Sequence, residues 1–63
     1  MNINRQKIEI LQAKQDISAK RLAELSGVSR QLISTIKTRG TCQPCTAQKI
    51  AKAFGVELED LMD

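Results

Sequence analysis

The stretch SAKRLAELSGVSRQLISTIKT, residues 18–38, decides the fold of this chain. Its apolar residues recur at three- and four-residue intervals, which predicts two helices separated by a short break. Ala23 is small enough for a second helix to cross closely, and Gly27, four residues later, suits a left-handed reversal that is costly for a residue with a β-carbon. Val28 is placed to close the corner between the helices. The spacing therefore predicts a helix-turn-helix.

Helical spacing continues on both sides of this stretch, and no segment alternates apolar and polar residues for long. Asn4, Ser18 and Ser29 are placed to cap helices, and Gly55 is placed to end one. We therefore expect an all-α fold of five short helices, at residues 4–15, 18–25, 29–38, 46–54 and 57–62. The residues that we expect in its core are Ile8, Leu11, Leu22, Val28, Ile33, Ile36, Ile50, Ala51, Phe54 and Leu61.

Length and charge bound the class of protein. The chain has 63 residues, 41% of them hydrophobic, which fits one compact domain over residues 1–63. All ten Lys and Arg lie in residues 1–54 with three acidic residues, whereas residues 55–63 hold four acidic residues and no basic one. A basic body suggests a polyanionic partner, although it also serves solubility alone. No apolar run reaches the about 20 residues of a membrane span, and the N-terminus lacks the apolar core of a signal peptide, so we expect a cytoplasmic protein with no membrane partner.

The face of the third helix that is expected to be exposed is basic and polar. It carries Arg30, Gln31, Ser34, Thr35 and Lys37. Arg and Gln are residue types that form paired hydrogen bonds with guanine and adenine edges, and one α-helix fits the major groove. The alternative is a purely structural helical hairpin, which has no reason to keep this face basic and polar.

At this point the chain resembles a known family. The segments IEILQAKQDIS, LAELSGVS, ISTIK and PCTAQKIAKAFGV are similar to the Cro and CI repressor type of helix-turn-helix domain, the XRE family. The resemblance covers nearly all of residues 8–61. It implies a five-helix, lambda-repressor-like DNA-binding domain with a central helix-turn-helix. It also implies a phage-repressor-like protein that binds palindromic double-stranded DNA as a homodimer.

The resemblance further implies which residues touch DNA. The residues at base-reading positions of the recognition helix are Arg30, Gln31, Ser34 and Thr35. Those at phosphate-binding positions are Ser18, Lys20, Thr38 and Arg39.

Three departures from the family pattern have physical consequences. The family often has Gln where this chain has Ala19, so a brace between the recognition helix and a phosphate is absent. An Arg–Glu pair common in the family is replaced by Gln12 and Lys37, which leaves no stranded buried charge and frees Lys37 to point at phosphate. The turn KTRGT, residues 37–41, is one residue longer than the common form, so it stays open which of its residues reaches the DNA backbone.

Cys42 and Cys45 stand in the motif CQPC and are the two cysteines of the chain. With no histidine, one chain cannot supply the four ligands of a structural zinc site, so a complete site could form only between chains. A redox motif of this spacing normally accompanies a β-α-β unit, and no strand is expected. We expect instead that Cys45 opens the fourth helix with Gln48 as its capping-box partner, and that Cys42 packs as a small hydrophobe. An effect of thiol oxidation on the dimer remains a hypothesis.

The resemblance places the dimer contact near this loop and near the acidic C-terminal end. The candidate dimer-interface residues are Cys42, Pro44, Leu58 and Met62. The alternative for Leu58 is that it covers the core with Val56 and Leu61. The acidic side chains of this end are repelled by phosphate, which keeps it away from DNA.

These patterns favour a sequence-specific DNA-binding transcriptional regulator, a repressor of phage or mobile-element type. The rival class is a protein-interaction adaptor or antitoxin that uses the same fold with weak DNA binding, and the Ala19 departure gives it some weight. The chain has no His, no nucleophile–base pair and no glycine-rich phosphate loop. We therefore expect no enzymatic activity, no cofactor, no metal site and no small-molecule ligand.

Overall fold

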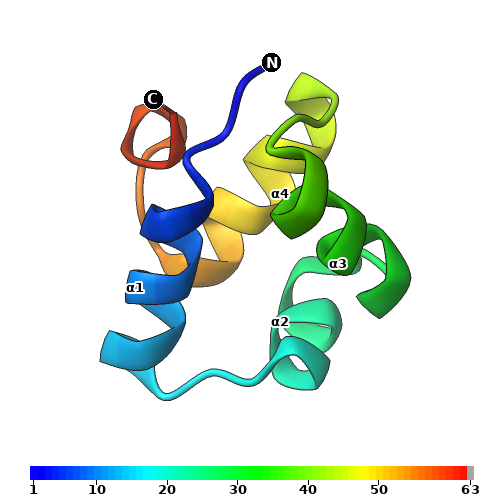
Figure 1. Ribbon diagram of the computed structural model, residues 1–63. Helices are drawn as coiled ribbons and strands as arrows, with labels where there is room; N and C mark the ends of the chain where they lie inside the picture. The colour runs from blue at the N-terminus through cyan, green and yellow to red at the C-terminus, as the bar shows by residue number, and fades with distance from the viewer. Residues whose placement is uncertain (63) are drawn as a thin grey trace.

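Four α-helices make up most of the computed structural model, which describes residues 1–62 (Figure 1). They are α1 (Arg5–Gln15), α2 (Ala19–Ser26), α3 (Arg30–Arg39) and α4 (Pro44–Phe54), followed by one turn of 3-10 helix, η1 (Leu58–Leu61). The all-α fold class is confirmed. The expected helix-turn-helix is α2, the turn at residues 27–29, and α3.

Three of the α-helices begin at the side-chain caps that the sequence predicts. The Asn4 side chain accepts hydrogen bonds from the backbone N–H groups of Gln6 and Lys7, at 3.0 and 3.3 Å. The Ser18 and Ser29 hydroxyls each accept one from the N–H three residues on, at 3.1 Å. These bonds satisfy N–H groups that have no partner inside the helix, which sets where each helix begins.

Gly27 makes the corner between α2 and α3. Its φ is +74°, in the left-handed region, and its N–H donates to the carbonyl of Ala23 at 2.9 Å. Val28 follows directly and is buried. A β-carbon at Gly27 would meet nothing within 4 Å, so the need for glycine comes from the backbone conformation and not from lack of space.

The start of α4 differs from the prediction. The helix begins at Pro44, two residues before the expected Thr46, and its N-cap is Gln43, which makes no side-chain capping bond. The expectation that Cys45 opens the helix, with Gln48 as a capping partner, is therefore wrong. Proline suits the first helical position because its missing N–H is one that the helix leaves unpaired anyway, and its fixed φ already matches the helix.

The fifth helix is also shorter than expected. Residues 57–62 were expected to be helical, but only a 3-10 turn forms, Leu58–Leu61, closed by reciprocal capping bonds between Glu57 and Asp60. Met62 leaves the turn because it pairs with Ile3 in an antiparallel bridge. The Leu61 carbonyl accepts a hydrogen bond from the Asn4 N–H at 2.8 Å. Extended pairing and helix propagation cannot use the same backbone groups, so the helix stops after one turn.

One hydrophobic cluster fills the space between these elements. α2 packs against α3 and α4, α1 packs against α3 and η1, and α4 packs against η1. Leu11, Val56 and Leu58 lie at its edge and are half-buried, whereas Ile3 and Ala47 are buried without having been predicted. The buried members are Ile3, Ile8, Leu22, Val28, Ile33, Ile36, Ala47, Ile50, Ala51, Phe54 and Leu61.

An extended N-terminal arm, residues 1–4, links two parts of the chain that are distant in sequence. On one side, the Ile3 N–H donates to the Gly40 carbonyl at 2.8 Å and the Cys42 N–H donates to the Met1 carbonyl at 3.1 Å. On the other side lies η1, which the arm meets through Asn4 (Figure 1). The arm therefore joins the end of α3 to the C-terminal turn.

Replacing Gly27 tests the corner. Gly27→Ala is expected to lower the free energy of unfolding by about 1–2 kcal/mol, because alanine is strained at this φ. Gly27→Asn should cost less, since asparagine tolerates the left-handed region. Thermal unfolding followed by circular dichroism measures both. Equal melting temperatures for the wild type and Gly27→Ala would contradict the prediction.

Candidate nucleic-acid interface

Helix α3 divides cleanly into a buried and an exposed side. Ile33 and Ile36 are each 1% exposed and face the core. The residues between them in sequence turn outward, because successive side chains are about 100° apart around an α-helix. The exposed residues of the predicted site on this helix are Arg30, Gln31, Ser34, Thr35, Thr38 and Arg39. The four residues expected at base-reading positions thus lie together on the solvent side of α3.

Two threonine hydroxyls on this side are already engaged within the helix. Thr35 donates to the Gln31 carbonyl and Thr38 donates to the Ser34 carbonyl, both at 3.0 Å. A hydroxyl has one hydrogen to donate, so an external partner meets only the acceptor lone pairs and the methyl group of these side chains. The donors at the four base-reading positions that remain are the Arg30 guanidinium, the Gln31 amide and the Ser34 hydroxyl.

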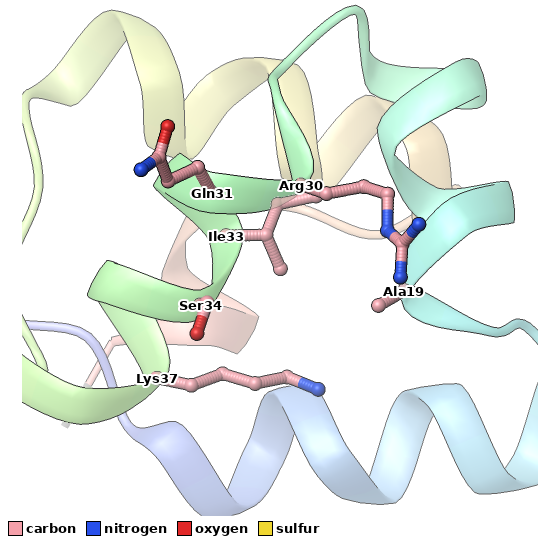
Figure 2. Close-up of a pocket in the computed structure, with 6 residues that line it drawn as sticks. All are labelled: Ala19, Arg30, Gln31, Ile33, Ser34 and Lys37. Atoms are coloured by element: carbon pink, nitrogen blue, oxygen red, sulfur yellow. The ribbon is translucent and has the colours of Figure 1, made fainter.

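An open groove separates α3 from the first turn of α2. Arg30, Gln31, Ile33, Ser34 and Lys37 line it from α3, and Ala19 lines it from α2. Figure 2 shows the Arg30 and Lys37 side chains extending from α3 toward the side where Ala19 lies, whereas Gln31 points away from α2. The side chain of Ala19 is only a methyl group, so it does not fill the groove.

The electrostatics of this groove favour an anion. The first turn of α2 contains no acidic residue, and its leading N–H groups carry the positive end of the helix dipole. Arg30 and Lys37 add two positive charges on the facing side. The ion pair found among residues 1–62 lies elsewhere, between Arg21 and Glu24 at 3.4 Å. None of the described residues that line this groove is acidic, and phosphate oxygens match its donors.

The residues expected at phosphate-binding positions lie at two places. Ser18 and Lys20 are exposed at the start of α2, although the Ser18 hydroxyl is already the cap of that helix. Thr38 and Arg39 are exposed in the last turn of α3. Lys37 is half-buried and stands in the groove near Ala19, so it links the two places.

Arg5 also belongs to this surface, and the sequence analysis did not identify it. Its Nη1 donates to the Thr38 carbonyl at 2.9 Å, across 33 positions of sequence. A cation in the first turn of α1 opposes the dipole of its own helix, and that turn has no acidic residue. The same cation stabilises the C-terminus of α3, where carbonyls lack partners. A basic first turn without an acid was the only hint in the sequence.

Two of the four candidate dimer residues, Cys42 and Met62, flank the N-terminal arm. Cys42 is half-buried, packs against the core and bonds to Met1 of the arm, while Met62 pairs with Ile3 on its other side. Pro44 is exposed in the first turn of α4, and Leu58 is half-buried at the start of η1. Leu58 packs against the hydrophobic core, which is the alternative role that the sequence offers for it.

The two thiols are free and sit in different surroundings. Burial raises the pKa of the Cys42 thiol above its ordinary value of 9.0, and the nearby Cys45 acts in the same direction against the opposing N-terminal amine. A raised pKa leaves less thiolate at neutral pH, so Cys42 is a weak nucleophile. Cys45 is exposed, with its Sγ 3.7 Å from the Gln43 side-chain oxygen. Cys42 packs against the hydrophobic core, so it behaves as the small hydrophobic residue that the sequence predicts.

Two further observations concern other classes of site. Within residues 1–62, no three His, Cys, Asp or Glu side chains gather into a group that could hold a metal ion. Every helix in this described part is too short or too polar to traverse a lipid bilayer.

Arg5 can be tested by its effect on the end of α3. Arg5→Met keeps the aliphatic stem but removes the donor to Thr38, and is expected to cost about 0.5–1 kcal/mol of stability. Amide exchange in the last turn of α3 should accelerate, because that turn loses a tether. Lys49→Met, at an exposed position of α4, is the control and should stay within about 0.5 kcal/mol of the wild type. Unchanged exchange at the end of α3 would show that Arg5 does not hold it.

Comparison with known proteins agrees with this geometry. A family model described as the Cro/C1-type HTH DNA-binding domain matches residues 7–63. No curated protein and no solved structure shows a significant match. The matched segment contains α2, the Gly27 corner and α3, together with the helices that support them. The chain therefore belongs to the family of Cro/C1-type helix-turn-helix DNA-binding domains.

Proposed function

We propose that this protein is a sequence-specific transcriptional regulator that inserts α3 into the major groove of double-stranded DNA. The observation that carries the proposal is the exposed side of α3, where Arg30, Gln31 and Ser34 present donors while Ile33 and Ile36 hold the opposite side in the core. Arg and Gln suit guanine and adenine edges, respectively. Thr35 offers an acceptor oxygen and a methyl group, because its hydroxyl hydrogen is used inside the helix.

Phosphate contacts set the orientation of α3 in this proposal. The groove between Ala19 and Lys37 takes one phosphate, held by Lys37 and by the N–H groups that begin α2. Lys20 contacts the DNA backbone beside this phosphate. Arg39 and Thr38 contact the backbone of the opposite DNA strand. Lys37 replaces the missing brace at Ala19 by charge, since an ammonium group attracts phosphate without a fixed hydrogen-bond geometry.

The length of α3 argues for a dimer on a palindromic site. Ten residues span about 15 Å of helix, which covers roughly four base pairs at 3.4 Å per pair. So few base pairs recur too often in a genome to define one operator. Two copies related by a two-fold axis double the site, with half-sites about 34 Å apart. The proposed dimer contact comprises Cys42 and Met62, which flank the arm, together with Pro44 and Leu58.

Repression is the simplest outcome of such binding. A protein that occupies promoter DNA blocks polymerase by its bulk, without any further activity of its own. This role fits a repressor of phage or mobile-element type that works in the cytoplasm. The rival role, an adaptor or antitoxin with weak DNA binding, draws on the loss of the Gln contact at Ala19.

Selection of binding sites from random duplexes tests the proposal directly. We expect a two-fold symmetric consensus with half-sites about one helical turn apart, bound by two chains per duplex. Electrophoretic mobility shifts and sedimentation give affinity and stoichiometry. Failure to enrich any duplex at low ionic strength would favour the adaptor role.

Variants of the selected complex separate base reading from phosphate binding. Arg30→Ala and Gln31→Ala should each weaken the selected site by about 5- to 150-fold and relax preference at one position, because a paired base contact is lost. Lys20→Ala should weaken selected and random duplexes alike and reduce the salt dependence by about one ion. Filter binding over a range of salt concentrations distinguishes the two patterns. Undiminished sequence preference in the Arg30→Ala, Gln31→Ala double variant would refute the base-reading assignment.

A further inference from the structure

Leu32 is the exposed apolar residue on the helix that carries the proposed base-reading residues. Its side chain is 40% exposed, although large aliphatic side chains in this protein mostly lie in the core. The other large hydrophobic residues exposed among residues 1–62 are Met1, Ile10 and Leu25, all outside α3. Neither the fold nor the proposed polar contacts account for Leu32.

The position of Leu32 puts it at one edge of the reading face. It follows Gln31 and precedes Thr35 by three residues, so the Leu32 and Thr35 side chains are neighbours on the helix surface. It lies about 200° around the helix from Arg30, on the edge away from the groove that Arg30 and Lys37 line. One edge of α3 is therefore cationic, and the other is apolar beside the methyl group of Thr35.

The chemistry of the major groove offers one apolar partner for this edge. Base edges present nitrogen and oxygen atoms, and the groove walls present phosphates, all of which lose hydration if leucine covers them. The C5-methyl group of thymine is the exception, and apolar side chains contact it in sequence-specific complexes. When the binding of a protein to DNA buries one methyl group away from water, the affinity rises about fourfold.

We propose that Leu32 contacts the C5-methyl group of a thymine in each half-site and makes this protein select thymine at that position. The inference rests on the proposed function, in which α3 lies in the major groove. It adds a specificity-determining residue that reads DNA by apolar contact, beside the hydrogen-bonding residues Arg30 and Gln31.

Deoxyuridine substitution tests the inference, because deoxyuridine differs from thymidine only by the C5-methyl group. Each thymine of the selected duplex is replaced symmetrically in both half-sites, and dissociation constants are measured for the wild type and Leu32→Ala. We expect one thymine position at which the wild type loses about fourfold per half-site. Leu32→Ala should bind the thymine and deoxyuridine duplexes equally at that position.

Two control variants sharpen the comparison. Leu25→Ala removes a leucine that is 44% exposed on α2, and should keep the full response to the methyl group. Leu32→Met keeps an apolar side chain of similar volume, so this variant should also keep most of the response to the methyl group. Circular dichroism should show the wild-type helix content for all three variants, since both leucines are exposed.

The outcomes separate this inference from the proposed function. Equal losses for the wild type and Leu32→Ala at every thymine overturn the inference alone, as does a selected consensus without thymine opposite α3. A weaker self-association of Leu32→Ala in the absence of DNA would assign Leu32 to a protein contact and overturn it as well. If no duplex is selected, the proposed function fails, and the inference fails with it.

Discussion

Ile33 and Ile36 anchor α3 in the hydrophobic core, and this one-sided burial is the constraint from which the remaining features follow. Because two aliphatic side chains take up one side of a ten-residue helix, its other side must face solvent. The corner at Gly27 sets the angle at which α3 leaves α2, and Val28 fills that corner. Burial of these two residues holds α3 against the core without using its exposed side chains. Those side chains are then available for a partner.

The two ends of α3 are held by different means. The N-terminus of α3 is capped by the neighbouring residue Ser29. The C-terminus of α3 is held by residues from the N-terminal end of the chain. The Arg5 guanidinium bonds to Thr38, and the arm residue Ile3 bonds to Gly40. A reading helix must keep its angle to the DNA axis, so tethers at both ends serve recognition as well as stability. The arm that supplies the second tether also contacts Cys42 and Met62.

Charge and apolar surface are divided between the two edges of α3. Arg30 and Lys37 face the start of α2, where the helix dipole is positive and no acidic side chain intervenes. Leu32 occupies the other edge. Three of the seven acidic residues, Glu57, Glu59 and Asp60, lie instead at η1. This division suits a ligand that is anionic along its backbone and carries both polar and methyl groups on its bases.

The amino-acid sequence by itself was sufficient to predict what depends on near neighbours. The caps at Asn4, Ser18 and Ser29, the left-handed glycine at Gly27 and the inward faces of α2 and α3 all follow from residues within one or two helical turns. Spacing also brought the candidate base-reading residues to one side of a helix. Their roles on DNA remain proposals.

Only the tertiary structure decided the features that join distant segments. The arm pairs Ile3 with Met62, which stops the last helix after one turn, and Arg5 reaches across 33 positions to Thr38. Neither contact has a periodic pattern, because a hydrogen bond between segments depends on where the chain folds back and not on local spacing. The direction of Lys37 into the groove beside Ala19 was settled in the same way, by the approach of two helices.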